Sequence, residues 1–370
     1  MNLSYWELDT YFRNVDFVIV GSGIVGLSTA YHLKLKYPGA KILILEKGML
    51  PEGASTKNAG FACFGTLSEI LWYLESNPKD EIYKLVERRW KGLQKLRKLL
   101  GDEKIDYHQW GGYEIFRNQD KEMMEKSLDK LDEINQWLFP IFNANPYKKS
   151  NQNFGFENTI GMIETPFEGQ IHTGQMMKAF MRLVTTENIS ILNNVEVVNV
   201  IDNERNVEIE LNNKFKFNSD KVFLCTNAFT RQLYDLDVMP ARAQVLVTKP
   251  IENLPFKGCF HMDEGFYFFR NIGDRILFGG GRNLDIEGET TTEFAVTERI
   301  QNRLETYLKE IILPNQKFEI EHRWSGIMGM GAKRNPIVKQ LSENVYCGVR
   351  LTGTGVAIGS LVGEELADLL

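Results

Sequence analysis

Three glycines between a short apolar run and a helical pattern constrain the fold of this chain more than any other feature. Residues 16–20 are mostly apolar and β-branched, as in a buried parallel strand, and the sequence Gly-Ser-Gly-Ile-Val-Gly follows at residues 21–26. A helical pattern covers residues 24–36, and a second apolar run covers residues 41–46. Strand, glycine-rich turn, helix and strand in this order predict a βαβ unit that binds a dinucleotide.

Each glycine of this motif has its own physical task. Gly21 permits the tight turn, Gly23 lets the backbone approach a pyrophosphate, and Gly26 lets helix and strand pack closely. The helix N-terminus offers unpaired N–H groups to the anion. Glu46 follows Gly26 by twenty residues, where a carboxylate accepts hydrogen bonds from the ribose of an adenosine and repels a 2′-phosphate. NAD and FAD both remain open at this point, because both carry an adenosine diphosphate half.

Length and composition favour a globular protein of two domains. A chain of 370 residues exceeds what one ordinary core holds, and 43% hydrophobic with 25% charged residues is typical of a folded protein. The net charge of −6, without a dense block of Lys and Arg, argues against nucleic-acid binding. The sequence has no run of eighteen consecutive apolar residues, so no membrane-spanning helix is predicted. Four widely spaced cysteines predict a cytoplasmic protein without disulfides and without a metal site.

Segments late in the chain are expected to return to the first sheet. Residues 221–225 form a short apolar run of the buried parallel kind. Residues 345–348 predict another short strand, which a glycine-rich turn at 352–355 connects to a helix over 356–370.

These segments resemble those of the D-amino-acid oxidase family of FAD enzymes, whose members oxidise amino acids, sarcosine, glycine or polyamine conjugates. In chain order the resemblance rests on SYWE at 4–7, GASTKNAGF at 53–61, CTNAFT at 225–230, RWSGIMGM at 323–330 and LTGTGVAIG at 351–359. It implies an α/β fold, in which an FAD-binding Rossmann-like domain of the glutathione-reductase type is joined to an α+β substrate domain on a mixed β-sheet.

The resemblance also implies how the two domains divide the chain. We expect residues 1–80, 147–235 and 325–370 in the FAD-binding domain, and residues 81–146 and 236–324 in the substrate domain. The substrate would lie between the domains at the face of the flavin.

Cys63, Cys225 and Cys347 lie near the motifs expected to contact the flavin, but no arrangement of nucleophile and base surrounds them, so we expect the FAD to be held without a covalent bond. By the same resemblance the loop at 53–61 would lie along the pyrophosphate and the flavin ring, and the turn at 352–355 would direct the positive end of the last helix at that ring. The backbone of Val197 would bind the adenine. The residues expected to bind the cofactor are Gly21, Ser22, Gly23, Ile24, Val25, Gly26, Glu46, Lys47, Ser55, Thr56, Lys57, Asn58, Ala59, Gly60, Val197, Thr226, Asn227, Arg350, Thr352, Gly353, Thr354, Gly355 and Val356.

The substrate side departs from the family pattern. Members that resemble glycine oxidase carry an arginine two residues after the WxG motif, where it binds the substrate carboxylate, but Met328 stands there in this chain. Leu277 or a neighbour stands where sarcosine-oxidase-like members have a lysine that promotes reaction with oxygen. The electron acceptor is therefore oxygen or another molecule. The arginines that remain as replacements for the carboxylate clamp are Arg270, Arg282, Arg334 and Arg350.

An aromatic strand segment, Phe-Tyr-Phe-Phe at 266–269, is expected to wall the cavity with alternate residues. Either Tyr267 and Phe269 or Phe266 and Phe268 face it. We expect Tyr267, Phe269, Arg270 and Arg350 to line the substrate cavity. His172 precedes a helix, where a capping role is favoured over a general base, and the other histidines, including His261, are interpreted as ordinary structural residues.

Together these features predict an FAD-dependent oxidoreductase. It would oxidise a C–N bond of a small amine or amino acid by hydride transfer from the carbon next to the nitrogen to flavin N5. Two alternatives remain open: an NAD-linked dehydrogenase, and a flavin-binding protein that has lost catalysis. The sequence gives no indication of the oligomeric state.

Overall fold

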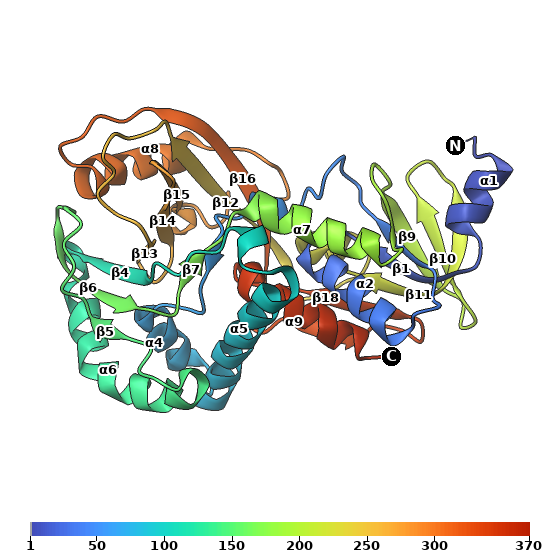
Figure 1. Ribbon diagram of the computed structural model, residues 1–370, viewed down its shortest axis with the longest axis horizontal. Coiled ribbons are helices and arrows are strands. Elements are labelled where there is room, and N and C mark those ends of the chain that lie inside the picture. Colours follow the sequence, from blue (N-terminus) through green and yellow to red (C-terminus); the bar gives the residue numbers. More distant parts are fainter. Residues whose placement is uncertain (1) are drawn as a thin grey trace.

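Two large mixed sheets lie next to each other in the computed structural model, which describes residues 2–370 (Figure 1). In spatial order the first sheet consists of β17 (Ile337–Gln340), β18 (Val345–Val349), β11 (Lys216–Leu224), β1 (Val15–Val20), β2 (Ile42–Leu45) and β8 (Ser190–Leu192). Strand β1 pairs in parallel with β2 and β11, and β11 pairs in parallel with β18. The predicted βαβ unit and the predicted return of two later strands to this sheet are confirmed.

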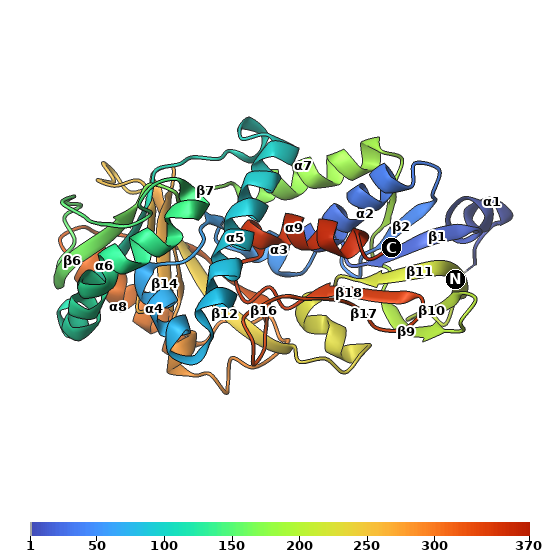
Figure 2. The ribbon, with the colours of Figure 1, turned by 90° about the horizontal axis from the view of Figure 1, so that it is seen from below.

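Helices cover one face of the first sheet and strands cover the other. Helices α2 (Ile24–Lys36), α7 (Thr173–Thr186) and α9 (Gly355–Ala367) pack on the first face. Strands β9 (Val197–Asp202) and β10 (Val207–Leu211) continue from β11 and enclose a second apolar cluster on the opposite face. Figure 2 shows the helices above the sheet and the β9–β10 pair below it.

The second sheet carries most of the aromatic strands. Its spatial order is β16 (Ile320–Met330), β12 (Met239–Thr248), β15 (Arg275–Gly280), β14 (Tyr267–Ile272), β13 (Cys259–Met262), β4 (Gly112–Arg117), β6 (Thr159–Thr165) and β5 (Lys148–Lys149). Helix α8 (Glu298–Tyr307) packs on one face through Ile300 and Leu304.

Three further helices and a small two-stranded sheet complete the architecture. The helices are α4 (Leu67–Ser76), α5 (Lys79–Leu100) and α6 (Lys121–Phe142), and β3 (Phe61–Ala62) pairs with β7 (Gly169–Gln170). The short helices α1 (Tyr5–Glu7) and α3 (Ala54–Lys57) lie near the N-terminus and after β2. Within residues 2–370 no helix is both long enough and apolar enough to cross a membrane.

The expected α/β fold with a mixed second sheet is confirmed, whereas the exact domain boundaries stay a prediction. Strands β5 and β6 fall inside the segment 147–235 that we assigned to the FAD-binding domain, yet they pair with the second sheet. The long strand β16 pairs with β12 along its whole length and begins before residue 325.

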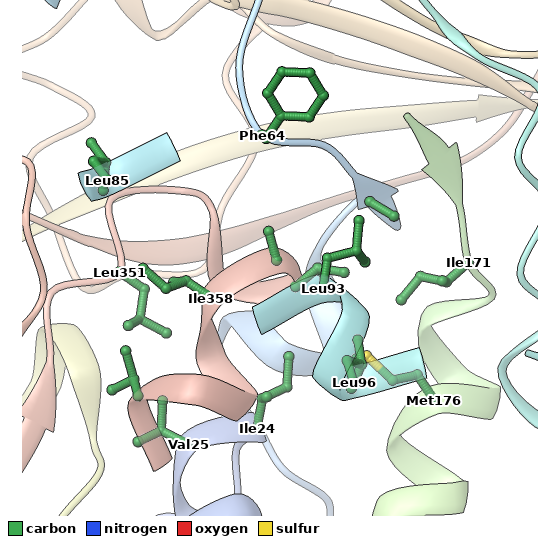
Figure 3. Close-up of a cluster of buried hydrophobic side chains, with 14 of the residues drawn as sticks. Ile24, Val25, Phe64, Leu85, Leu93, Leu96, Ile171, Met176, Leu351 and Ile358 are labelled. Atoms are coloured by element: carbon green, nitrogen blue, oxygen red, sulfur yellow. The ribbon is translucent and has the colours of Figure 1, made fainter. Parts of the chain in front are cut away.

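An apolar cluster joins the helices of the two regions (Figure 3). Ile24 and Val25 of α2 and Ile358 of α9 pack with Leu93 and Leu96 of α5. Helices α5 and α9 approach so closely that the contact requires glycine. A Cβ on Gly92 would lie 2.3 Å from the carbonyl oxygen of Ala357.

Replacing Gly92 by alanine is therefore expected to destabilise the fold. The atoms that the new methyl group would meet belong to the backbone of α9 and cannot rotate away. We therefore expect the free energy of unfolding to fall by about 1–3 kcal/mol, even though alanine has a better helix propensity than glycine. Unfolding in urea measures this. The matched control is Gly39→Ala, because Gly39 is exposed and a Cβ there would meet nothing within 4 Å. Equal stability of the two variants would contradict the prediction.

Candidate active site

A cavity of about 410 Å³ is lined by residues from both large sheets. The first sheet and its helices contribute Gly21 after β1, Glu46 after β2 and Gly355 at the start of α9. The second sheet contributes Phe268 of β14 and Met328 of β16. The glycine turn, the end of β2 and the start of α9, which the sequence predicts to bind one dinucleotide, thus line the same cavity.

The turn after β1 has a backbone that requires glycine. Gly21 has a φ of +100°, and a Cβ on Gly26 would lie 2.0 Å from the carbonyl oxygen of Gly21. A Cβ on Gly23 would lie 2.9 Å from Oγ of Ser55. The turn, the first residues of α2 and the loop that carries Ser55 are therefore in close contact, and the N-terminus of α2 faces the cavity.

Glu46 is a buried carboxylate fixed by neutral donors. Its Oε2 accepts hydrogen bonds from the backbone N–H of Ser22 at 3.0 Å and from the Ser22 hydroxyl at 2.8 Å. Its Oε1 accepts from the N–H of Gly48 at 3.1 Å. The side chain is 6% exposed and lines the cavity, so the carboxylate is oriented there before any ligand binds.

The loop at 53–61 is held in place from behind by Arg270. Its Nε donates to the carbonyl of Ala59, and its Nη2 donates to the carbonyl of Ile171 at 3.0 Å. Burial lowers the pKa of Arg270 to about 10. Arg270 does not line the cavity, because its guanidinium donates to these backbone carbonyls. Its predicted place in the lining of the substrate cavity is therefore corrected.

Arg350 likewise supports the cavity wall without lining it. Its Nη1 donates to Oδ2 of Asp237 at 2.6 Å, and its Nε donates to the carbonyl of Asn335 at 3.0 Å. Its backbone has a φ of +64°, and its N–H donates to Oδ1 of Asn227 at 3.0 Å. The side chain of Arg350 is used by Asp237 and Asn335 and is not part of the cavity lining, so a contact of this residue with substrate or cofactor stays a prediction. Thr352 and Gly353, the next residues of the turn, do line the cavity.

Strand alternation decides which aromatic residues face the cavity. Phe266 and Phe268 line it, whereas Tyr267 and Phe269 are buried in the core of the second sheet. The ring of Phe269 stacks on Phe260 with centroids 4.7 Å apart. The choice of Tyr267 and Phe269 is corrected, because the pleat turns them toward α8.

Most of the expected cofactor-binding residues line the cavity. Besides Arg350, three do not: Ser22 binds Glu46, Gly26 packs against Gly21, and the hydroxyl of Thr56 donates to the carbonyl of Pro51. The cavity-lining residues from the predicted set are Gly21, Gly23, Ile24, Val25, Glu46, Lys47, Ser55, Lys57, Asn58, Ala59, Gly60, Val197, Thr226, Asn227, Thr352, Gly353, Thr354, Gly355 and Val356.

Sequence reasoning missed the part of the cavity that α4 and β13 form. Trp72 and Tyr73 of α4 line it, although only a helical pattern was visible in that segment. His261 also lines it, and its Nε2 lies 2.8 Å from Oε2 of the buried Glu168. Burial by itself lowers the pKa of His261, but the Glu168 carboxylate raises it above its ordinary value. Glu168 precedes His261 by 93 positions in the sequence, so no local pattern predicts this pair.

The predicted capping role of His172 is confirmed, since its Nδ1 accepts the N–H of Gln175 at 3.2 Å at the start of α7.

A second buried carboxylate, Glu114, lies close to His261. Ser68 donates to both of its oxygens, while burial raises the pKa of Glu114 to about 7. Among residues 2–370 no group of three His, Cys, Asp or Glu side chains could hold a metal ion.

Comparisons with known proteins agree on one family. Residues 16–369 match the family model described as FAD dependent oxidoreductase (DAO). The chain is 20% identical to a probable oxidoreductase OrdL of Haemophilus influenzae, over 98% of this chain and 84% of that protein. It is 21% identical to the gamma-glutamylputrescine oxidoreductase of Escherichia coli, over 99% and 86%. The crystal structure of glycine oxidase from Geobacillus kaustophilus superposes with a TM-score of 0.77 at 16% identity, covering 96% of this chain and 94% of that one.

The raised pKa of Glu114 predicts a pH dependence of stability. Because the folded state holds this proton more tightly than the unfolded state, the stabilisation is complete below about pH 4.5 and is lost as the pH rises through about 7. In the wild type the free energy of unfolding should fall by an amount on the order of 3 kcal/mol over this pH range, and we expect the Glu114→Gln variant to lack this decrease. Urea unfolding at pH 5 and pH 8 measures it. Glu122→Gln, at an exposed position on α6, is the control. The same pH dependence in wild type and Glu114→Gln would refute the assignment.

Proposed function

The chain belongs to the DAO family of FAD dependent oxidoreductases, and on this premise we propose that it oxidises the C–N bond of a small amine or amino acid. One observation carries the proposal: the dinucleotide turn, the loop at 53–60 and the start of α9 surround a cavity whose remaining wall comes from the aromatic strands of the second sheet. One relative is a gamma-glutamylputrescine oxidoreductase and one structural neighbour is a glycine oxidase, which supports an amine or amino acid as the substrate.

We propose that the residues of the first sheet hold the FAD. Glu46 would accept the ribose hydroxyls of the adenosine, and the glycine turn with the N-terminus of α2 would receive the pyrophosphate. The loop at 53–60 would lie along the flavin, and the backbone of Val197 would contact the adenine. The positive end of α9, at Thr354 and Gly355, would face the flavin ring. The close approaches at Gly21 and Gly23 fit a ligand that contacts the backbone directly.

When bound, FAD supplies a two-electron acceptor for a hydride from the carbon next to the amine nitrogen. The chain would contribute binding and orientation. Phe266 and Phe268 give this part of the cavity an apolar wall, which disfavours the charged ammonium form of a substrate and favours the neutral amine that can lose a hydride.

The electron acceptor would be oxygen or another small molecule. Leu277, at the place considered for an oxygen-activating lysine, is 2% exposed and packs with Ala59 and Val245 in an apolar cluster. A cytoplasmic location belongs to the same proposal and is supported by four cysteines that form no disulfide. The family match removes the NAD-linked alternative, and a catalytically silent flavoprotein is the outcome that the next experiment can reveal.

Anaerobic reduction of the bound flavin tests the proposed function. Purified holoenzyme is expected to be yellow and to lose its absorbance with at least one member of a panel of primary amines, N-methyl amino acids and D- and L-amino acids. Each 2-oxo acid or alcohol of matching shape serves as a control and should leave the flavin oxidised. A yellow protein that no amine reduces would refute the proposed activity and favour the silent flavoprotein.

Exchange of Glu46 tests the proposed ribose contact. We expect Glu46→Gln to bind FAD about tenfold or more weakly, because a carboxylate that accepts charge-assisted hydrogen bonds is replaced by an amide that must also place its NH₂ group near Ser22. Equilibrium titration of apoprotein with FAD measures the affinity. Glu52→Gln is the control, since that side chain is exposed a few residues away. Unchanged affinity of Glu46→Gln would show that the carboxylate has no role in FAD binding.

A further inference from the structure

Two arginines, Arg282 and Arg334, line the same cavity and have no carboxylate partner. Arg282 follows β15, and Arg334 lies between β16 and β17. Across residues 2–370 the side chains of these two arginines form no ion pair and donate no hydrogen bond. The Nε of Arg282 is buried, and no acceptor reaches it. Both arginines are half-buried, and a buried donor is normally paired, so the Nε of Arg282 gives this part of the cavity a donor for a ligand that is not part of the chain.

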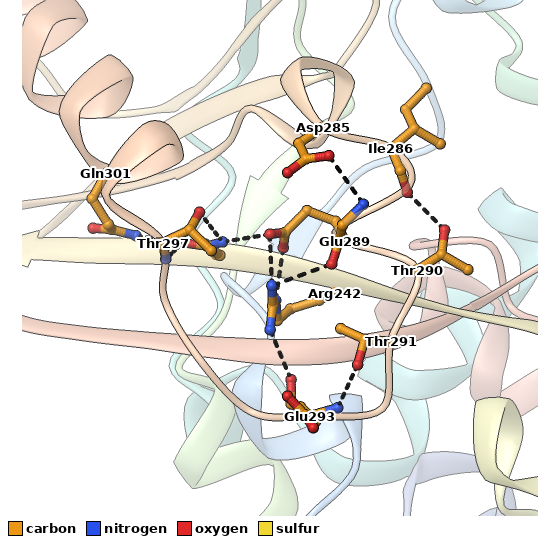
Figure 4. A network of polar contacts seen from close by, with 11 residues as sticks. Arg242, Asp285, Ile286, Glu289, Thr290, Thr291, Glu293, Thr297 and Gln301 are labelled. Carbon is orange, nitrogen blue, oxygen red and sulfur yellow. Dashed lines mark hydrogen bonds and ion pairs between the residues drawn. The ribbon is translucent and has the colours of Figure 1, made fainter.

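Glu289, whose negative charge acts on Arg282, already has another partner. Glu289 accepts hydrogen bonds from Nε and Nη2 of Arg242, each at 2.8 Å, and a third at 2.9 Å from the side chain of Gln244 (Figure 4). This bidentate pair is fully buried and fixes the segment after Arg282 over β12. Glu289 therefore cannot turn to neutralise Arg282 without leaving Arg242 unpaired.

Arg334 is held in position by other means. Its guanidinium carbon lies 4.8 Å from the ring centre of Trp72 and 5.1 Å from that of Tyr73. Its backbone carbonyl accepts the hydroxyl of Thr352 at 3.1 Å, and Arg350 binds the carbonyl of the next residue, Asn335. Stacking leaves the edge of the guanidinium, where its N–H groups lie, free to donate.

The charges of the two arginines act on each other. Burial lowers the pKa of Arg282, and the positive charge of Arg334 adds to that shift. Four acids also line the cavity, Glu46, Glu69, Glu196 and Glu264, but none of them forms an ion pair with these arginines among the residues described. Glu69 forms an ion pair with Arg89 at 3.3 Å and accepts a hydrogen bond from the hydroxyl of Tyr73. Burial and the negative charges of Asp263 and Glu75 raise the pKa of Glu264.

We infer that Arg282 and Arg334 form an anion-binding subsite for a carboxylate of the substrate, so that the substrate is an amine that also carries a carboxylate group. This inference rests on the proposed function and specifies its substrate. A planar carboxylate matches the fork of a guanidinium, whereas Met328 on β16 offers no donor. The subsite thereby moves carboxylate recognition from the sheet to two segments that follow strands β15 and β16.

Binding of a carboxylate without an amine tests the subsite directly. Holoenzyme is titrated with butyrate, with its neutral isostere butyramide and with inorganic phosphate, by calorimetry and by the change in the visible spectrum of the flavin. We expect butyrate to bind, and Arg282→Met and Arg334→Met each to raise its dissociation constant about tenfold or more. Butyramide should bind more weakly than butyrate and respond little to either substitution.

Matched controls separate a local effect from a general loss of charge. Arg299→Met and Lys333→Met each remove an exposed cation that does not line the cavity, and both should bind butyrate as the wild type does. Flavin content and melting temperature are measured for every variant. Where a methionine variant does not fold, the lysine variant at the same position is used, and we expect intermediate affinity because the charge remains but the planar fork is lost.

Three results would overturn the inference: an unchanged butyrate affinity in both methionine variants, equal binding of butyrate and butyramide, or tighter binding of phosphate than of butyrate. Anaerobic reduction by the best amine of the panel and by its carboxamide separates this failure from that of the proposed function. If both reduce the flavin equally well, only the subsite is refuted. If no amine reduces it while butyrate still binds through the two arginines, only the proposed activity is refuted.

Discussion

The contact between Gly26 and Gly21 sets the geometry on which the rest of the structure depends. Because no side chain separates them, the first turn of α2 packs directly against the end of β1. Two further glycines bring α9 onto α2 in the same way. A Cβ on Gly359 would lie 2.8 Å from Ile24, and one on Gly363 would lie 2.4 Å from Cβ of Ser28. The N-termini of α2 and α9 consequently reach one cavity, where both helix ends favour negative charge.

Several arginines near the cavity support its wall, and two others line it. Arg270 and Arg350 donate to backbone carbonyls, and Arg350 also to Asp237, so they fix the loops behind the wall. Arg242 is neutralised by Glu289 (Figure 4). Arg282 and Arg334 are half-buried and line the cavity without an acidic partner among residues 2–370, and the Nε of Arg282 is a buried donor whose acceptor a ligand would supply.

Local sequence was sufficient for the first sheet and for the identity of the cofactor. The strand, turn and helix around Gly21 are set by neighbours in the chain, and the order of the later motifs pointed to FAD. The substrate side could not be predicted equally well. Four consecutive aromatic residues give no sign of which face is buried, and only the register of β14 between β13 and β15 turns Phe266 and Phe268 to the cavity. The partners of Arg350 and His261, 113 and 93 residues away, leave no local pattern either.

This difference has a physical origin in how the two sides of the cavity are built. The cofactor side relies on backbone contacts at glycines, where almost any side chain would collide, so its motif is visible in the sequence. The opposite wall is made of side chains on strands and on the loops that follow them, where exchange of one residue leaves the backbone unchanged. Met328 illustrates this, because it lines the cavity from β16, where a different side chain would leave the strand pairing with β12 unchanged. An arginine can therefore be lost from β16 and its charge supplied from positions 282 and 334 without any change in the fold that holds the cofactor.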